Sequence, residues 1–159
     1  MELPGIAISF NNPTDFPVLD TETGVSGVHE ITLPVITDDR GDLTFVESGT
    51  HVPFAIRRVY YLYNVPTSKA RGGHAHKQLK QVIFALSGSF RITLEDGRNK
   101  TTYVLCDPSR GLLIDGLVWR EMDQFSEGAI CMVLASQPFD DDDYIRDYDM
   151  FLQAAGLAQ

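Results

Sequence analysis

Two histidines separated by one residue, His74 and His76, are the side chains of this chain best suited to chemistry. They follow directly on the segment Arg71-Gly72-Gly73. In a β-strand, residues two positions apart point to the same face, so both imidazoles are expected on one side. Imidazole titrates close to neutral pH and is also a common metal ligand. The pair therefore indicates either a metal site or a site that moves protons.

The residues after the pair bear on that choice. Gln81 follows His76 after four residues, and Gly88 follows Gln81 after six. This spacing resembles the first motif of the cupin superfamily, in which two His, a Glu and a later His hold an ion. Here the Glu position is Gln81, and the run 116–122 puts Arg120 at the later His position. A neutral amide is a poor ligand for a divalent ion and a fixed cation repels it. We therefore expect a metal-free site that transfers protons.

The elements that must position these groups are short strands. Phe90, Ile92 and Leu94 alternate with more polar residues, as in a half-buried strand, and Asp96-Gly97 predicts a hairpin turn. Similar short runs recur between turn signals, with little room for crossover helices. They are residues 28–33, 43–47, 55–64, 80–86, 89–95, 100–105, 112–114 and 129–135. This pattern predicts an all-β fold, a cupin-like jelly roll of antiparallel strands.

Other side chains with chemical potential fall on predictable faces of these strands. Tyr60, two residues after Arg58, should share its face, and Gln81 should point with Ile83 and Ala85. Arginines are permanent cations suited to phosphate or enolate oxygens. These facings are expectations from strand alternation, which a single bulge would reverse.

The charge of the chain is unevenly distributed. The formal net charge of −9 disfavours nucleic acid or an anionic membrane as partner. Yet residues 48–94 contain no Asp or Glu, which suggests a pocket for an anionic ligand such as a nucleotide-linked small molecule; a chance gap on a solvated face is the alternative. The basic residues of that segment are Arg57, Arg58, Lys69, Arg71, Lys77, Lys80 and Arg91.

The two ends differ from the body. Residues 1–27 are rich in Pro, Gly, Asn and Thr and predict an irregular arm, with one domain over residues 28–159. Near the other end, Ile145, Tyr148 and Leu152 have helical spacing, which predicts a short C-terminal helix. The four acids Asp140 to Asp143 are explained better as a solvated helix start than as a cation site.

Targeting signals are not evident in the sequence. No apolar run approaches the roughly 20 residues that cross a bilayer, and the N-terminus has no basic start followed by an apolar core. Cys106 and Cys131 lie in or beside apolar strand-like runs, so we expect free, buried thiols in a reducing compartment. These features predict a cytoplasmic protein.

Ordered segments between about residues 30 and 152 resemble one family closely, the sugar 3,4-ketoisomerases that act on dTDP-4-keto-6-deoxyglucose. The segments are residues 39–43, 53–61, 71–77, 81–82, 118–122, 133–136 and 143–148. The resemblance implies an isomerase of deoxysugar biosynthesis, as in O-antigen or glycan formation. It also implies a homodimer of cupin-like subunits, commonly with exchanged strands, and no metal or organic cofactor.

The same resemblance implies roles for individual residues. His74 falls on the family's catalytic base and Tyr60 on its active-site tyrosine, while Arg40 occupies a turn that reaches the sugar. Family members carry either His or Arg at the position of Arg120, so we expect it to influence which face of C4 receives the proton. The predicted catalytic residues are His74, Tyr60 and His76, and the predicted substrate-binding residues are Arg40, Arg58, Arg71, Gln81, Trp119 and Arg120.

Other functions remain open at this point. A sugar-nucleotide 3,5-epimerase uses a similar metal-free barrel with His and Tyr, but it would exchange the C5 hydrogen of the sugar with solvent, whereas a ketoisomerase would label C4 of the product. A ligand-binding cupin without turnover would leave the sugar unchanged. A metal-dependent dioxygenase would need stoichiometric iron.

Overall fold

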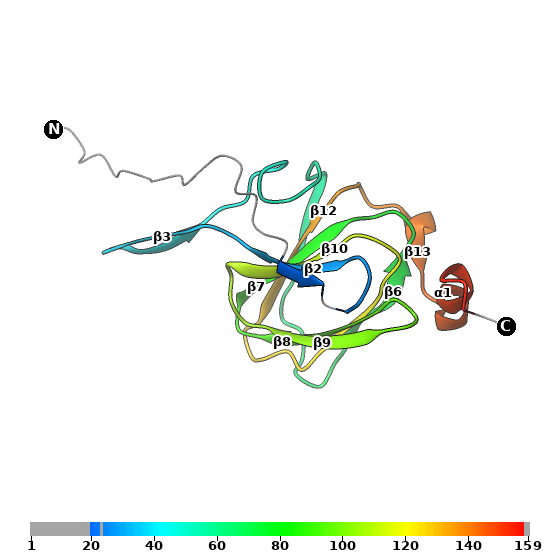
Figure 1. Cartoon of the computed structure of the whole chain (residues 1–159). Coiled ribbons are helices and arrows are strands. Elements are labelled where there is room, and N and C mark those ends of the chain that lie inside the picture. Colours follow the sequence, from blue (N-terminus) through cyan, green and yellow to red (C-terminus); the bar gives the residue numbers. More distant parts are fainter. Residues whose placement is uncertain (1–19, 23, 158–159) are drawn as a thin grey trace.

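The computed structural model describes residues 20–22 and 24–157, and its main elements are β-strands (Figure 1). The strands are β1 (Asp20–Glu22), β2 (Val28–Thr32), β3 (Val35–Asp38), β4 (Gly41–Thr44), β5 (Arg58–Leu62), β6 (Arg71–His76), β7 (Gln81–Ser87), β8 (Phe90–Glu95), β9 (Lys100–Leu105), β10 (Arg110–Ile114), β11 (Trp119–Asp123), β12 (Ile130–Ala135) and β13 (Tyr144–Ile145). A 3-10 helix, η1, spans Asp141–Asp143, and the helix α1 spans Tyr148–Ala154.

Two facing sheets form the body of the molecule. The larger sheet has the order β1-β2-β10-β7-β12-β5, and the smaller one has the order β13-β6-β11-β8-β9. Every pairing between these strands is antiparallel. Neighbours in each sheet are mostly distant in sequence, as in a jelly roll. The prediction of an all-β, cupin-like fold with a short C-terminal helix is confirmed.

The strand β8 illustrates why these sequences become strands. Its residues alternate between buried and half-buried positions, with Phe90, Ile92 and Leu94 fully buried. The hairpin to β9 closes at the predicted turn, where the Asp96 N–H donates to the Asn99 carbonyl and Gly97 adopts a positive φ of 92°. Glycine accepts that conformation without the steric cost that other residues meet.

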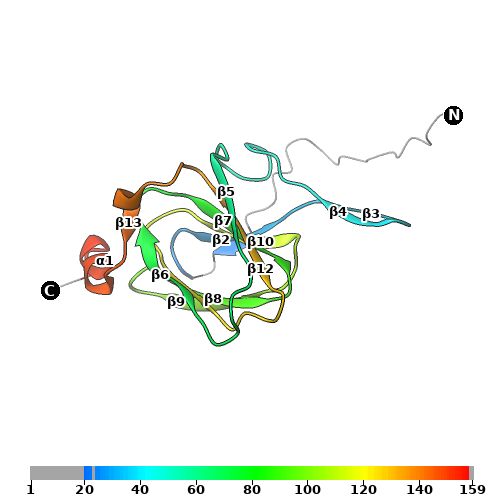
Figure 2. The same ribbon diagram turned by 180° about the vertical axis from the view of Figure 1, so that it is seen from behind.

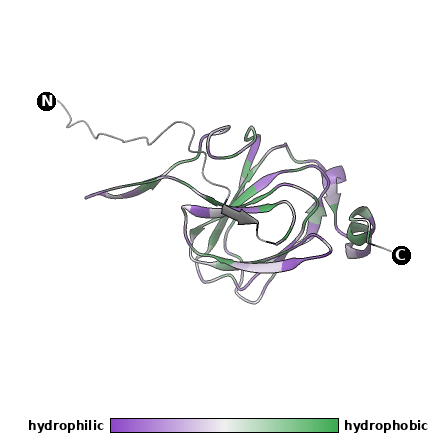
Figure 3. Cartoon of the chain, viewed as in Figure 1, coloured by the Kyte–Doolittle hydropathy of each residue, from purple (hydrophilic) through white to green (hydrophobic). Residues whose placement is uncertain are grey.

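The hydrophobic residues form a core between the sheets and a layer on each outer face. The inner core includes Ile83, Phe90, Ile92 and Leu112. Outside the larger sheet, Val52 and neighbours from the segment before β5 cover a second cluster. In Figure 3, hydrophobic colour follows the central strands, while the turn before β13 is hydrophilic (Figure 3). The core between the sheets is therefore a separate hydrophobic cluster from those on the two outer faces.

The hairpin of β3 and β4 stands apart from this body. It pairs only with itself among the described residues, from Val35 opposite Thr44 to Asp38 opposite Gly41. Two opposite views show it projecting away from the barrel, on the side opposite α1 (Figures 1 and 2). The sequence predicted a strand over 43–47, so β3 and the start of β4 were missed, and residues 45–47 lie beyond the end of β4.

The C-terminal helix begins later than predicted. Ile145 belongs to β13, and α1 starts at Tyr148, where the side chain of Asp147 caps it by accepting from the Met150 N–H at 2.9 Å. The helical spacing of Ile145 was coincidental, because that residue packs under α1 from the sheet. The four acids also separate: Asp140 caps η1, whereas Asp143 is buried.

The N-terminal arm and the two cysteines match their predictions in part. Residues 1–19 of the predicted arm lie outside the described residues, and its later part includes β1, paired with β2. Cys131 is buried as predicted, and burial raises its pKa to about 12. Cys106 is exposed, which corrects the prediction for that thiol. None of the helices in the described ranges is long and apolar enough to cross a bilayer.

Candidate active site

Polar side chains from four strands meet inside the barrel, at one end of the inner core. They are Arg58 and Tyr60 of β5, His74 and His76 of β6, Gln81 of β7 and Arg120 of β11. The strand register brings them together. Arg58 and Gln81 both lie opposite Ala135 of β12, and Arg120 lies opposite His74. We refer to these six residues as the polar cluster.

The two histidines share a face, as their spacing predicted. Their ring centroids lie 4.9 Å apart in an edge-to-face arrangement. Tyr144 lies opposite His76 in the pairing of β13 with β6. The centroid of its ring lies 4.3 Å from that of His76 and 5.0 Å from that of His74. His76 is completely buried, and His74 is partly exposed. His74 is therefore the histidine of the pair that a bound molecule can reach more directly.

The side chain of His76 is hydrogen-bonded to Asp143. The imidazole Nδ1 lies 2.9 Å from Asp143 Oδ2, and both side chains are buried. The same carboxylate accepts the backbone N–H of Gln78 at 2.8 Å and that of Leu79 at 3.3 Å. Asp143 thus ties the end of β6 to the segment before β13.

A directed chain of hydrogen bonds runs through the cluster to Tyr60. The Arg120 guanidinium donates to Gln81 Oε1, and Gln81 Nε2 donates to the Tyr60 hydroxyl oxygen at 2.7 Å. Arginine can only donate, so it forces the amide oxygen of Gln81 toward itself and the amide nitrogen toward Tyr60. The Tyr60 hydrogen is then free to be donated to a bound oxygen, and each bond polarises the next.

Both imidazoles are neutral near pH 7. Burial, followed by the positive charge of Arg120, lowers the pKa of His74 to about 4. Burial, Arg120 and the neighbouring His74 together lower the pKa of His76 to about 3, although its bond to Asp143 acts in the other direction. A neutral imidazole has a free lone pair, which a general base requires.

The hydrogen-bond donors of the cluster keep their protons. Burial raises the pKa of Tyr60 to about 12, so its hydroxyl remains protonated. Burial lowers the pKa of Arg120 to about 10, which still leaves the guanidinium charged at neutral pH. The cluster therefore combines neutral bases with one phenol donor and one buried cation, a combination that stabilises a developing oxyanion.

The cluster also holds unsatisfied hydrogen-bonding atoms. In the described part of the chain, three buried side-chain nitrogens lack a partner: Arg58 Nε, His76 Nε2 and Arg120 Nε. All three belong to the polar cluster. Buried polar groups are nearly always hydrogen-bonded, and exceptions concentrate where a ligand or catalytic role explains them. These nitrogens indicate where polar groups of a bound molecule would be received.

The donor set does not fit a divalent metal ion. Of the four positions that hold an ion in metal-binding cupins, only His74 and His76 carry ligand side chains. The other two carry Gln81 and Arg120, which hydrogen-bond to each other beside the histidines. The fixed positive charge of the Arg120 guanidinium beside the histidines repels a metal cation. No group of three or more His, Cys, Asp or Glu able to hold a metal occurs among the described residues.

Three predicted binding residues lie away from the cluster. Trp119 points to the outer face of the smaller sheet, where it packs against α1 and donates from Nε1 to Glu121 Oε1 at 3.0 Å. Neighbours in a strand face opposite ways, so the inward position of Arg120 excludes Trp119 from the site. Arg40 lies on the projecting hairpin, paired with Asp38 (Figure 2).

Arg71, the third of these residues, is exposed at the start of β6. It lines an open surface groove of about 440 Å³ together with Tyr61, Tyr63 and Lys69. The two glycines that follow Arg71 both have positive φ values, 87° at Gly72 and 72° at Gly73. The pairing of β6 with β11 shifts its register at this point, so the alternation of faces does not carry from the histidines back to Arg71.

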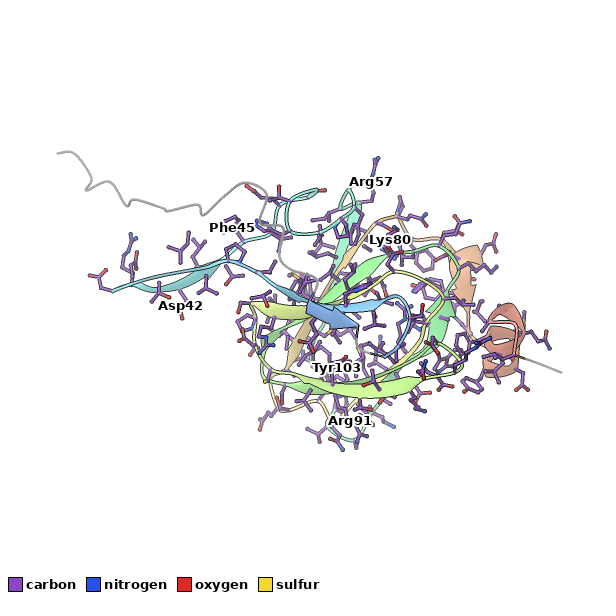
Figure 4. All side chains as sticks on the ribbon, viewed as in Figure 1. Asp42, Phe45, Arg57, Lys80, Arg91 and Tyr103 are labelled. Carbon is purple, nitrogen blue, oxygen red and sulfur yellow. The ribbon has the colours of Figure 1, made fainter. Side chains whose placement is uncertain are left out.

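The acid-free segment does not form one basic pocket. Arg57 and Arg91 lie on opposite sides of the molecule, and Lys80 lies between them (Figure 4). Lys80 pairs with Asp115 and Arg91 pairs with Asp123. Of the basic residues in that segment, only Arg58 contributes to the polar cluster.

Asp143 and Tyr144 are the site residues that sequence reasoning missed. Both lie within residues 143–148, a segment that contributed to the family resemblance. Their role was hidden because the run of acids before them predicted a solvated helix start. Asp143 and Tyr144 reach the histidines only because β13 pairs with β6. Asp143 and His76 are 67 residues apart in the sequence.

The sequence is similar to a family model and to proteins of known name. Residues 26–156 match the family model FdtA, described as WxcM-like, C-terminal. The chain is 45% identical over 116 residues to the TDP-4-oxo-6-deoxy-alpha-D-glucose-3,4-oxoisomerase of Aneurinibacillus thermoaerophilus, covering 73% of this chain and 84% of that one.

Solved structures place the fold in the same group. A mutant of the 3,4-ketoisomerase QdtA from Thermoanaerobacterium thermosaccharolyticum, in complex with TDP-4-keto-6-deoxyglucose, superposes with a TM-score of 0.81 at 43% identity, covering 82% of this chain and 95% of that one. A dTDP-4-dehydrorhamnose 3,5-epimerase from Bacillus anthracis has a TM-score of 0.68 at 19% identity, over 77% of this chain and 79% of that one, and shares the fold alone.

The fold and the polar cluster define a cupin-like protein with an acid–base site. The match over residues 26–156 then identifies the family: the chain belongs to the FdtA family of WxcM-like proteins, whose relatives named above are sugar-nucleotide 3,4-ketoisomerases.

Proposed function

We propose that this chain is a 3,4-ketoisomerase of a TDP-linked 4-keto-6-deoxyglucose. The observation that carries the proposal is the neutral, partly exposed His74 beside a buried guanidinium and a protonated Tyr60. Such a site can remove a proton next to a ketone and hold the resulting negative charge on oxygen. The relatives of known name act on a substrate of this class.

The first step assigned to this site is loss of the C3 hydrogen. His74 takes it as a proton, and the electron pair of the C–H bond moves toward the C4 carbonyl oxygen. Tyr60 and Arg120 donate hydrogen bonds to the enolate, since the Tyr60 hydrogen is not used by Gln81. Arg58, whose guanidinium lies 5.1 Å from the Tyr60 ring, is a further cation for oxygens of the ligand. To reach the 3-keto product, the C3 hydroxyl loses its proton as the C3 carbonyl forms, the oxygen on C4 gains a proton, and a proton returns at carbon C4. No redox cofactor takes part, because the substrate loses no electrons overall.

The test is incubation with TDP-4-keto-6-deoxyglucose in deuterated water, followed by proton NMR. The proposal predicts a 3-keto product with deuterium at C4 and an unexchanged C5 hydrogen. Exchange at C5 would support the 3,5-epimerase alternative and contradict the proposal. Saturable binding with an unchanged sugar would instead support a binding cupin without turnover.

We also propose that the protein acts as a homodimer whose projecting hairpin completes the partner's site. The hairpin carries half-exposed apolar side chains, Val35 and Leu43, and ends near Arg40. The edge strand β5 presents two exposed apolar side chains outward, Val59 and Tyr61, both more than half exposed. Exposed apolar surface of this kind is typical of protein contacts.

Subunit complementation tests the arrangement. Arg40→Ala and His74→Asn should each lower the activity of the homodimer. After subunits of the two variants are mixed and exchanged, about a quarter of the wild-type activity should return, because half of the dimers would hold one intact site. Absence of recovery would contradict an Arg40 that acts on the partner's site.

The location of the enzyme in the cytoplasm remains a prediction from the sequence.

A further inference from the structure

Phe139 is an aromatic side chain that is exposed and also lies beside the polar cluster. It belongs to the segment that joins β12 of the larger sheet to β13 of the smaller one, and it is 63% exposed (Figure 1). Its ring centroid lies 5.6 Å from the guanidinium carbon of Arg58 and 5.8 Å from the ring centroid of Tyr144. Phe139 therefore offers apolar surface to a molecule that binds at the cluster.

A row of aromatic rings and guanidinium groups extends from the cluster to the surface. At its inner end, the guanidinium carbon of Arg58 lies 5.1 Å from the ring centroid of Tyr60. The row continues through Phe139 and Tyr144 to Arg146, whose guanidinium carbon lies 4.3 Å from the Tyr144 centroid. Tyr60 and Tyr144 are partly buried. Among the three rings of this row, Phe139 is thus the one most open to solvent.

The contacts of Phe139 place it close to the sugar rather than the nucleobase. Arg58 belongs to the polar cluster, and Tyr144 contacts His74, which takes the C3 hydrogen in the proposed reaction. Carbon C6 of the sugar is attached to C5, the neighbour of C4. The nucleobase, in contrast, is separated from C4 by the anomeric carbon, the diphosphate and the ribose. A side chain one contact away from the cluster is therefore within reach of C6.

The chemistry of the ring matches C6 of a 6-deoxy sugar. In such a sugar C6 is a methyl group, which is the apolar substituent of a pyranose ring whose other substituents are oxygens. A methyl group that contacts the ring buries apolar surface, which is favourable. A hydroxyl held against a benzene ring would lose hydrogen bonds to water without replacement. The contact therefore favours the 6-deoxy sugar over the 6-hydroxy sugar.

We propose that Phe139 is a specificity-determining residue, whose ring contacts the C6 methyl group and selects 6-deoxy over 6-hydroxy sugar nucleotides. Arg58 and Tyr144 contact the ring and fix its position. Phe139 touches the sugar away from the reacting atoms, so it acts on binding and not on proton transfer. The inference rests on the proposed function, because that function puts C3 and C4 of the sugar at the cluster.

Calorimetry with TDP-6-deoxyglucose, TDP-glucose and TDP tests the contact. The two sugar nucleotides differ only in the C6 hydroxyl, and neither has a ketone, so no turnover occurs. Wild-type protein should bind the 6-deoxy compound about tenfold more tightly than TDP-glucose, the lower end of what one group contributes in an apolar site. In Phe139→Ala this ratio should fall below about threefold, while the Kd for TDP should stay within about twofold.

Two further variants control for the nature of the change. Phe139→Leu keeps an apolar side chain and should retain at least about half of the wild-type ratio. A Leu variant without any preference would contradict the apolar basis of the selection. Val104→Ala shortens a side chain of similar exposure, 64%, on the edge strand β9, and should leave the ratio unchanged.

Other outcomes would overturn the contact. An equal loss of affinity for all three ligands in Phe139→Ala would show that the ring acts on the nucleotide, through Arg58 or by stacking on the base. A ratio that does not change would also overturn it, and a weaker dimer in analytical ultracentrifugation would then assign the ring to a subunit contact. Wild-type protein that leaves the keto sugar unchanged in proton NMR would contradict the proposed function, whereas the ratio in Phe139→Ala would still decide the contact.

Discussion

Trp119 and Arg120 are neighbours on β11, yet they belong to two regions with opposite properties. Arg120 points inward to His74 and Gln81, in a region where buried nitrogens lack partners. Trp119 points outward to Phe151 of α1, in a small apolar cluster where its own N–H is satisfied by Glu121. The inner face of the smaller sheet holds buried polar groups without hydrogen-bond partners, whereas the outer face holds packed apolar side chains.

Under the proposed function, one sheet separates the reacting side chains on its inner face from an apolar cluster that stabilises the fold on its outer face. The inner face tolerates buried polar groups because a ligand can satisfy them, while the outer face contributes apolar burial. Substitutions on the two faces should therefore change different quantities. The following experiments test that separation.

The largest effect is expected on the outer face. Phe151→Ala removes a completely buried ring from the cluster under α1 and should lower the free energy of unfolding by about 3–5 kcal/mol. Urea unfolding measures this, with the exposed Met150→Ala as control. The kcat of the folded fraction should stay within about twofold. A large fall in kcat with unchanged stability would show that the two faces are not separate.

The inner face should respond in the opposite way. His74→Asn should lower kcat by at least about a hundredfold, since a positioned base is lost, and should change the free energy of unfolding by less than about 1 kcal/mol. Steady-state kinetics with the keto sugar and urea unfolding check both values. His29→Asn, on β2, is the control histidine. Normal turnover by the His74 variant would contradict its role as base.

The pH dependence sharpens the inner side of the comparison. Burial and Arg120 lower the pKa of His74 to about 4, so the base is deprotonated above that pH. kcat/KM should therefore stay constant from neutral pH down to about pH 5 and fall below it, whereas an unperturbed histidine would titrate near pH 6.5. A fall centred near pH 6.5 would contradict the buried, cation-facing base.

The same shifts predict the stability control for that experiment. The unfolded chain binds protons on both histidines below about pH 6.5, while the folded chain does not until about pH 4. The pKa values of His74 and His76 are both lowered by folding, so the free energy of unfolding should fall as the pH falls through this window. Initial rates should therefore be paired with circular dichroism at each pH.

The smallest effect is expected from Trp119→Phe. The change removes the hydrogen bond to Glu121 and part of the contact with α1, which should cost about 1 kcal/mol of unfolding free energy. KM for the sugar nucleotide should not change, because the indole lies outside the barrel. A KM raised more than about threefold would restore Trp119 as a binding residue.

Much of the site follows from local spacing. The alternation of strands placed His74 beside His76 and Arg58 beside Tyr60, and it directed Gln81 to the inner face with Ile83. These relations need only the two-residue period of a strand. The hairpin at Asp96-Gly97 was predictable for the same reason, since the turn and its flanking alternation lie in one short segment.

What the sequence alone determined is therefore the set of side chains that share a face within each strand. The tertiary structure decided which strands meet, because sheet pairing joins segments far apart in the chain. Pairing of β13 with β6 brought Asp143 to His76, and the inward position of Arg120 sent Trp119 to the outer face. It also left Arg40 on a hairpin outside the barrel. Local periodicity carries no information about such long-range pairing.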